Sequence, residues 1–407
     1  MDRPLIHFVM RRYVVASTTS LMFLLASCAM AANIAEPSAM QGGTRQTLQV
    51  GANRIIKTIA QAAVLARDGD TVEVDAGNYL NDVAVWQQDN LTVRAVGGRV
   101  RLQANGASAE GKGIWVIRGG RIQVEGFDFS GARVADRNGA GIRFEKGALT
   151  VRHCSFVNNE MGLLTGNDER AELSVENSEF AHNKRPDGHN HNLYVGRIAR
   201  LSVKGSYFHH GHTGHLLKSR ARVNHIENNR LTDETDGRAS YELEFPDGGV
   251  AYVIGNIIGQ SRLTENPVLI SFGAEGYKWP VNQLYLVNNT LINDRLYGGS
   301  FLRVRAGADA VRAVNNLLVG PGKLEHAGTW DFRNNFTIGS EGLENLPNGN
   351  FRLKIASSPL GRAVDPGSAD GQDLKLYSEY VHPLTVEKLG APAQNPGAVQ
   401  RSGQPRP

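Results

Sequence analysis

Histidine is concentrated in one short part of the chain. Seven of the twelve histidines fall between residues 182 and 215, and no other stretch approaches this density. Three segments that alternate apolar with polar residues lie in or just after this stretch: HNLYVG (191–196), HLLKSRA (215–221) and YELEFPDGG (241–249). They carry imidazole, phenol, ammonium and carboxylate groups, which proteins use for proton transfer near neutral pH. We therefore expect the functional site among these segments.

Alignment of the three segments as neighbouring strands places their reactive side chains beside one another. The alignment pairs His191 with His215, Leu193 with Leu217 and Leu243, and Val195 with Ser219 and Phe245. Alternate residues of a strand face opposite sides, so Tyr194, Lys218 and Glu244 should form an outward-facing row. Adjacent strands are about 4.8 Å apart, close enough for the three side chains to act together.

The predicted site residues fall into two groups. Those expected to be catalytic can transfer a proton or stabilise charge: Lys218, Arg220, His191, Tyr194 and His215. Those expected to bind substrate flank the row or face outward on other strands: Glu242, Glu244, His189, Arg303 and Arg305. Arg143 and Glu145 also take outward positions, without reactive neighbours in the sequence; they either bind an anionic substrate at a distance or are solvated.

The assignment of the proton-transfer groups has several solutions. Lys218 could be the base because burial can lower the pKa of a lysine, although Glu244 beside it would keep the ammonium charged. Alternatively, His191, His215 or Tyr194 could move the proton while the cations neutralise a substrate carboxylate. A solvated ladder of ion pairs without chemistry is the third interpretation of the row.

Metal binding by the histidines is a further alternative. His189 and His191, and likewise His210 and His212, have the spacing of two ligands on one strand or turn. Such His-x-His pairs are common without a metal, so the sequence assigns no metal site.

The elements that must position these residues are repeated short strands. An eight-residue phrase recurs ten times between LTVRAVGG (91–98) and WDFRNNFT (330–337), at intervals of 19 to 33 residues. Each phrase reads as a strand followed by a turn, and a second strand precedes most phrases. This pattern predicts an all-β protein, a right-handed parallel β-helix solenoid of about ten coils. One Asn in each of several phrases should point inward and form an amide ladder: Asn177, Asn229, Asn256, Asn289, Asn316 and Asn335.

Two local resemblances accompany this repeat. IIKTIAQAAVLA (55–66) is amphipathic and predicts a short N-terminal capping helix, and IAQAAVLARDGDTVEVDAGNY (59–79) resembles the opening of the pectate lyase-like superfamily of right-handed parallel β-helix proteins. Lys218-Ser219, followed by Asn228-Asn229, loosely resembles a segment of the alginate lyase and chondroitinase B family, which implies that Lys218 is the base. That resemblance also implies Ca²⁺ held by carboxylates shortly before the lysine. Residues 192–217 contain no Asp or Glu, so the usual ligands are missing and no cofactor is assigned.

The N-terminal 32 residues have the features of an export signal. Arg3, Arg11 and Arg12 precede an apolar run, and Leu25-Ala26-Ser27-Cys28 resembles a bacterial lipobox, in which the Cys is acylated. Ordinary cleavage after Ala31 is the alternative. We expect a signal peptide at 1–32, a tether at 33–50, the β-helix at 51–338 and a loop-rich C-terminal cap or tail at 339–407.

The net charge and the predicted export signal limit the functions that this protein can have. The net charge is only +4 and no basic block occurs, which does not favour nucleic-acid binding. We expect an exported protein of the periplasm or outer membrane, attached to the membrane only through a lipid at Cys28. An acidic polysaccharide is the expected partner, and a lyase that removes the C5 proton of a uronic acid is the expected activity. A C5-epimerase, a glycoside hydrolase and a non-catalytic envelope protein that binds carbohydrate or is structural are the alternatives.

The lipobox interpretation predicts the behaviour of one variant. Cys28→Ser should abolish lipid attachment and release a soluble form, as measured by detergent partitioning and mass spectrometry of the mature N-terminus. If neither version carries a lipid and both begin after Ala31, the alternative cleavage is correct.

Overall fold

A computed structural model describes residues 45–185, 187–325, 328 and 330–400. The predicted signal peptide, Cys28 and most of the predicted tether lie outside the described residues. Among the described residues, no helix is long and apolar enough to cross a membrane.

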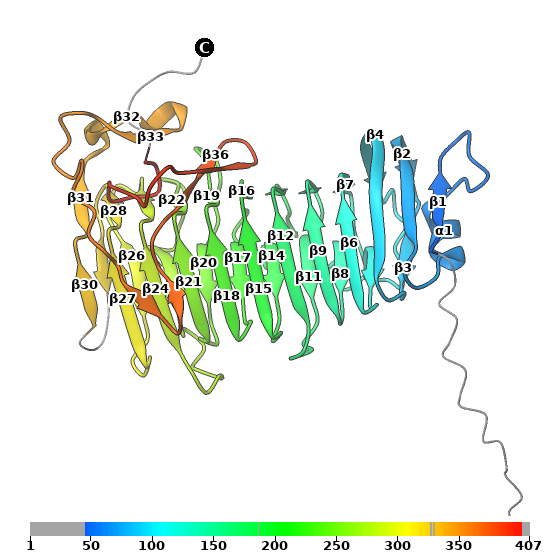
Figure 1. Ribbon diagram of the computed structural model, residues 1–407, viewed down its shortest axis with the longest axis horizontal. Coiled ribbons are helices and arrows are strands. Elements are labelled where there is room, and N and C mark those ends of the chain that lie inside the picture. The colour runs from blue at the N-terminus through cyan, green and yellow to red at the C-terminus, as the bar shows by residue number, and fades with distance from the viewer. Residues whose placement is uncertain (1–44, 186, 326–327, 329, 401–407) are drawn as a thin grey trace, which may run out of the picture. The chain divides into compact units, whose positions relative to one another are not determined.

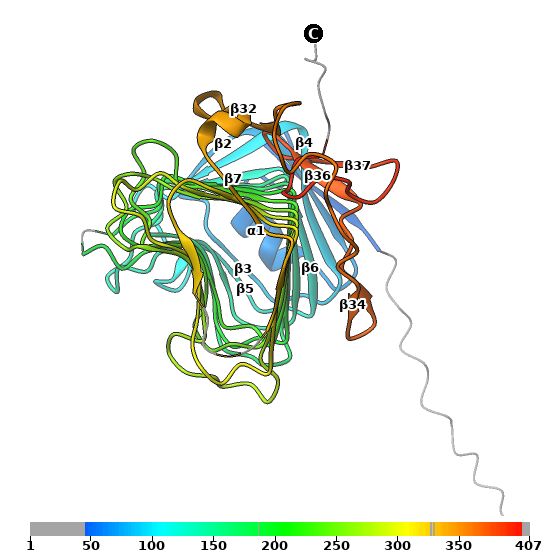
Figure 2. The same ribbon diagram turned by 90° about the vertical axis from the view of Figure 1, so that its left-hand side faces the viewer.

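The chain winds into a right-handed parallel β-helix of about ten turns, as the repeat predicts. Each complete coil has three strands, so the solenoid has three faces around one core (Figures 1 and 2). A 21-stranded parallel sheet supplies the first two faces, and a 10-stranded parallel sheet supplies the third face.

The strands of each face are short and follow one another coil by coil. The first face consists of β1 (Thr47–Val50), β2 (Thr71–Leu80), β4 (Leu91–Gln103), β6 (Arg121–Glu125), β9 (Ala148–Arg152), β12 (Glu172–Glu176), β15 (Arg200–Lys204), β18 (Val223–Glu227), β21 (Val250–Ile254), β24 (Gln283–Val287), β27 (Ala310–Val314) and β30 (Asp331–Arg333). The second face continues from the long strands β2 and β4 into β7 (Phe127–Ser130), β10 (Ser155–Val157), β13 (Glu179–Ala181), β16 (Tyr207–His209), β19 (Arg230–Thr232), β22 (Ile257–Gln260), β25 (Thr290–Asn293), β28 (Leu317–Val319) and β31 (Phe336–Ile338). The third face consists of β3 (Ala84–Trp86), β5 (Gly113–Ile117), β8 (Ala140–Phe144), β11 (Met161–Thr165), β14 (His191–Val195), β17 (His215–Ser219), β20 (Tyr241–Phe245), β23 (Val268–Phe272), β26 (Ser300–Val304) and β29 (Lys323–Glu325).

Like residues stack on like residues inside the solenoid. Phe129, Phe156, Phe180 and Phe208 are buried at the same place in successive coils, with ring centroids 5.0, 4.7 and 4.7 Å apart. Offset stacking of this kind adds about 0.5–1.5 kcal/mol per pair beyond the area that the rings bury.

A ladder of buried asparagines forms the turn between the first two faces. Asn229 Nδ2 donates to Asn256 Oδ1 at 3.0 Å, and Asn256 Nδ2 donates to Asn289 Oδ1 at 3.1 Å. The ladder continues through Asn316 to Asn335 at 3.0 and 2.8 Å. These five inward positions were therefore predicted correctly.

Asn177 was wrongly included in this ladder. It is the fifth residue of its phrase, one position before the ladder position, and its φ of 48° lies in the left-handed region that Asn tolerates. Ser178 takes the inward place instead, and its backbone N–H donates to Ser206 Oγ at 3.1 Å.

A helix covers the N-terminal end of the stack, and the C-terminal segment packs along its flank. The helix α1 (Ile59–Leu65) is shorter than the predicted 55–66; Thr58 caps it, and it buries Ile59, Ala62 and Ala63 against the first coils. After β31 the chain forms two 3₁₀ turns, η1 (Ser340–Gly342) and η2 (Leu346–Asn348), and three short hairpins. The hairpin strands are β32 (Leu343–Asn345), β33 (Asn350–Leu353), β34 (Ser368–Ala369), β35 (Gln372–Asp373), β36 (Ser378–Val381) and β37 (Thr385–Lys388).

This C-terminal segment runs back along the solenoid. Asn315 Nδ2 donates to Val364 O at 2.7 Å, and Asn228 Nδ2 donates to Ser378 Oγ at 2.8 Å several coils earlier. In Figure 1 the red strand β36 accordingly lies near the green strands β16 and β19.

The ladder predicts a large loss of stability from one substitution. Asn256→Ala removes the acceptor of Asn229 N and Nδ2, and buried groups without partners cost about 1–3 kcal/mol each. We expect a clear fall in the melting temperature measured by circular dichroism. Asn177→Gly is the matched control, because glycine accepts the left-handed backbone at this position and residue 177 lies outside the ladder. Equal melting temperatures of the two variants would contradict this account.

Candidate functional site

The predicted outward row lies on the third face. β14 pairs with β17, which puts His191 beside His215 and Tyr194 beside Lys218. β17 pairs with β20, which puts Lys218 beside Glu244. The register predicted by the alignment is thus confirmed, and Tyr194, Lys218 and Glu244 do form one row.

Lys218 is held by two carboxylates. Its Nζ lies 3.0 Å from Glu244 Oε2 and 2.9 Å from Glu275 Oε1, and its side chain is only 11% exposed. Burial acts to lower the pKa of Lys218, but the two carboxylates outweigh burial and raise the pKa above its ordinary value. The ammonium therefore stays charged near neutral pH, which argues against Lys218 as the base.

Arg220 connects the row to two further acidic residues. Its Nε donates to Tyr194 Oη at 3.0 Å, and its Nη2 donates to Glu275 Oε2 at 2.7 Å. Its Nη1 is paired with Asp247, which is fully buried and also accepts from Arg197 Nε at 2.7 Å. Arg220 thus fixes the phenol oxygen of Tyr194, and its own charge is already compensated.

Two histidines lie next to the row. The rings of His191 and His215 have centroids 4.6 Å apart, and the ring of His191 stacks on Tyr194 at 5.3 Å. His215 Nδ1 lies 3.1 Å from Glu244 Oε2.

Both histidines are held in the neutral form. Burial, and then the charges of His215 and Lys218, lower the pKa of His191 well below its ordinary value. Burial also lowers the pKa of His215, although Glu244 opposes this shift. A neutral imidazole can accept a proton at its unprotonated nitrogen. In His191 this nitrogen is Nδ1, which accepts the backbone N–H of His215 at 3.2 Å.

An open cleft lies on the N-terminal side of Tyr194. It has a volume of about 440 Å³, and its lining includes Asn138, Arg143, Thr165, Asn167, Arg185, His189, His191 and Tyr194. Arg143 pairs in register with Leu164, and Leu164 pairs with Tyr194 in the next coil. Arg143 therefore lies on the same face as the phenol of Tyr194, two coils away. Arg143 makes no ion pair with any described residue, whereas Arg185 is paired with Asp187 at 2.8 Å. The cleft therefore presents one uncompensated guanidinium beside His191 and Tyr194.

Glu242 is not available to a substrate, contrary to our expectation. Its side chain is fully buried, and neither carboxylate oxygen has a hydrogen-bond partner among the described residues. The strand does not alternate strictly here, because Glu242 and Leu243 are both buried in succession. Burial raises the pKa of Glu242 well above its ordinary value.

The two distant arginines have partners of their own. Arg303 Nε donates to Glu325 Oε2 at 2.8 Å, and Arg305 Nη1 donates to the backbone oxygen of Ala274 at 3.1 Å. Sequence reasoning placed Arg143 on this face away from the reactive row and missed Glu275. Glu275 comes from the loop after β23 and reaches back two coils, a contact that strand alignment alone cannot reveal.

Among the described residues, neither histidine pair at His-x-His spacing is joined by a third metal-ligating residue while the pair stays together. His189 and His191 line the cleft together, but His210 joins His182 and His209 instead of His212. Ca²⁺ does not fit the row either: Glu244, Glu275 and Asp247 are each bound to a lysine or arginine, which leaves no set of free oxygen ligands among the described residues.

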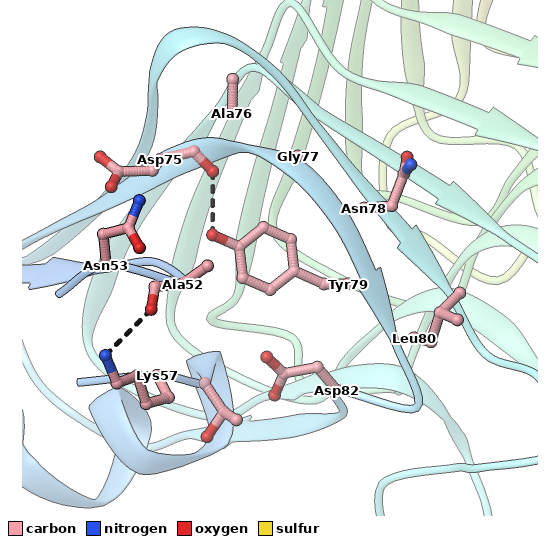
Figure 3. Close-up of a pocket in the computed structure, with 11 residues that line it drawn as sticks. Ala52, Asn53, Lys57, Asp75, Ala76, Gly77, Asn78, Tyr79, Leu80 and Asp82 are labelled. Atoms are coloured by element: carbon pink, nitrogen blue, oxygen red, sulfur yellow. Dashed lines mark hydrogen bonds between the residues drawn. The ribbon is translucent and has the colours of Figure 1, made fainter. Parts of the chain in front are cut away.

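A second hollow lies at the N-terminal end of the solenoid (Figure 3). It has a volume of about 520 Å³, and its lining includes Lys57, Asp75, Tyr79 and Asp82. Asp75 is paired with Arg54 at 2.8 Å, and Asp82 accepts the backbone N–H groups of Ile59 and Ala60 at the start of α1. Tyr79 Oη donates to Asp75 O at 2.9 Å, as Figure 3 shows. These groups hold the cap in place, so we do not take this hollow as the functional site.

The fold is the pectate lyase-like parallel β-helix, and it carries a histidine- and tyrosine-containing cleft on its third face. The solved structure of pectate lyase Pel9A superposes with a TM-score of 0.61 at 12% identity, over 88% of this chain and 97% of that chain. A pectin methylesterase from Aspergillus niger superposes with a TM-score of only 0.38 at 11% identity, over 81% of this chain and 94% of that chain. No family model matches the sequence, and the comparison with curated proteins gives no match.

The burial of Lys218 predicts a stability effect that an exposed pair would not have. Lys218→Met leaves Glu244 charged and nearly buried with only His215 beside it, and breaking a buried pair from one side costs about 3–5 kcal/mol. The melting temperature should fall by several degrees. Part of the loss should return in Lys218→Met/Glu244→Gln, which removes the uncompensated charge.

Lys204→Met is the control for this experiment. Lys204 ends β15 on the first face, is exposed and makes no ion pair with any described residue. Its substitution should leave the melting temperature unchanged. If Lys218→Met melts like Lys204→Met, the two carboxylates do not depend on the lysine.

Proposed function

We propose that this protein is an exported enzyme that cleaves a uronic-acid-containing polysaccharide by β-elimination. The observation that carries the proposal is the cleft in which the uncompensated Arg143 lies near the stacked pair of His191 and Tyr194. Elimination needs a cation for the sugar carboxylate, a base for the C5 proton and an acid for the leaving oxygen. The cleft offers one residue for each task.

Each residue has a role that its surroundings favour. Arg143 binds the uronate carboxylate and stabilises the negative charge that develops when C5 loses its proton. Neutral His191 takes the C5 proton at Nδ1, which gives up the backbone N–H of His215 that it accepts at 3.2 Å, and the electron pair of the C5–H bond forms the C4–C5 double bond. The C4–O bond breaks, and Tyr194 donates its proton to the leaving oxygen. Arg220 Nε, which donates to Tyr194 Oη, stabilises the resulting phenolate.

Hydrolysis is less compatible with the charges in the site. A glycoside hydrolase needs a protonated carboxylic acid near neutral pH and a second, free carboxylate. Burial acts to raise the pKa of Glu244, but His215 and Lys218 bind this carboxylate and lower its pKa. Lys218 and Arg220 likewise lower the pKa of Glu275 against the effect of burial. Asp247 is buried between two arginines. None of these carboxylates is free to act as an acid.

The proposal also includes a polysaccharide substrate and a cellular location for the protein. Pectate is the first substrate to test, since it is the polymer named for the superposable structure, and other uronate polymers follow. The signal-like N-terminus and the lipobox at Cys28 favour a protein of the periplasm or outer membrane.

The proposal predicts the kinetics of four variants on a panel of uronate polymers. Wild type should release unsaturated uronate, measured by ultraviolet absorbance. His191→Ala and Tyr194→Phe should each lower kcat by about 10²–10⁴-fold, the usual contribution of a proton-transfer group. Arg143→Ala should mainly raise KM. Arg303→Ala is the control, because this arginine lies on the same face in a different coil and is paired with Glu325.

The pH profile and the products separate the alternatives. Because burial lowers the pKa of His191, activity should persist below the ordinary histidine pKa and fall only when His191 is protonated at lower pH. A changed uronate ratio without new absorbance would identify an epimerase. Binding without any product would identify a carbohydrate-binding protein and overturn the proposal.

A further inference from the structure

Three histidines from two successive coils meet at the turn that leaves the second face. His182 follows β13, and His209 and His210 stand at the end of β16. Ala181 pairs with His209, so His182 lies beside His210, and their rings stack with centroids 4.4 Å apart. One ring nitrogen from each of the three lies within 4.8 Å of the other two.

Carboxylates fix the proton positions on two of these rings. His209 Nε2 lies 3.1 Å from Glu179 Oε1, and His210 Nε2 lies 3.1 Å from Asp236 Oδ1. A carboxylate oxygen at this distance from a ring nitrogen accepts a hydrogen bond from it. Each Nε2 therefore carries the proton of its ring, and each Nδ1 of a neutral ring carries a lone pair.

The two Nδ1 atoms face each other. His209 Nδ1 and His210 Nδ1 lie within hydrogen-bonding distance, an arrangement that is repulsive when both present lone pairs. A shared proton would satisfy these two atoms but would leave the nitrogen of His182 without a partner. A metal ion can accept all three lone pairs.

We propose that His182, His209 and His210 bind one divalent transition-metal ion of the zinc type. Imidazole nitrogens suit Zn²⁺, Cu²⁺ and Ni²⁺, and carboxylates on the far nitrogens are the usual outer partners of metal-binding histidines. Three protein ligands leave a fourth position, and the exposed side chain of His182 leaves that position open to water.

The metal would hold two loops that lead to the cleft. The loop 182–190 begins at His182 and ends before His191, and the loop 210–214 begins at His210 and ends before His215. The first loop carries Arg185 and His189, which line the cleft. The metal site is nevertheless independent of the proposed elimination, because none of its ligands lines the cleft.

Substitutions can remove the ligands without disturbing the turn. His182 and His210 have left-handed backbones, with φ of 55° and 46°. The corresponding residue of the preceding coil is Asn158, with φ of 60°. Asn therefore suits this turn, and His182→Asn and His210→Asn should fold like the wild type.

The test is a metal titration of the full chain after treatment with a chelator and dialysis. Zn²⁺ should bind at one equivalent per chain by calorimetry, and Co²⁺ should give the visible absorption of a tetrahedral nitrogen-ligated ion. His182→Asn and His210→Asn should each weaken Zn²⁺ binding by at least about 100-fold, and Glu179→Gln by about 10–100-fold. His212→Ala, which removes an exposed histidine of the same loop, should bind Zn²⁺ like the wild type.

Two results would overturn the metal site. The first is a wild type that binds no Zn²⁺ at micromolar concentrations, in which case His209 and His210 share a proton. The second is binding that His182→Asn and His210→Asn leave unchanged. Circular dichroism of the metal-free variants confirms that they fold, so a loss of binding reports on the ligands.

Discussion

Hydrogen bonding between successive coils fixes where each side chain of the solenoid lies. Each strand pairs in parallel with the same strand of the next coil, so one register relates Leu193, Leu217 and Leu243 inside and Tyr194, Lys218 and Glu244 outside. A shift of one residue would exchange the two sets and bury the charged row. The buried stacks of phenylalanine and asparagine oppose such a shift, since each side chain has its partner one coil away. The site therefore depends on contacts that contain no reactive group.

Charge compensation distinguishes the parts of the third face. Lys218 and Arg220 share Glu275, Lys218 also binds Glu244, and Arg220 also binds Asp247. With Arg197, which also binds Asp247, the network has three cations and three carboxylates. It can hold Tyr194 and His215 in place but has little charge left to attract a substrate. Arg143 lies outside the network and has no counter-charge among the described residues. An anion that enters the cleft gains most from this one guanidinium, which is why we assign it to the substrate carboxylate.

The sequence predicted the architecture well because each coil repeats the same local pattern. The spacing of the phrases identified the solenoid, and strand alternation gave the register of Tyr194, Lys218 and Glu244. The same alternation failed at Glu242, because β20 buries Glu242 and Leu243 in succession. It also gave no access to Glu275, which reaches the row from a loop. The histidine cluster was recognised as a group, but its division into His191 with His215 and His182 with His209 and His210 follows from the three-sided coil.

The C-terminal segment changes how the solenoid can come apart. In a stack where each coil touches only its neighbours, stability is a sum of local terms, and the last coils can fray alone. Here Asn315 is bonded to Val364 and Asn228 to Ser378, so the chain after the last coil is attached to coils well inside the stack. A terminal coil that opens therefore stays attached at both of its ends, to the preceding coil and, through the segment that follows, to the middle of the solenoid. The segment thus limits how far the end of the stack can unravel.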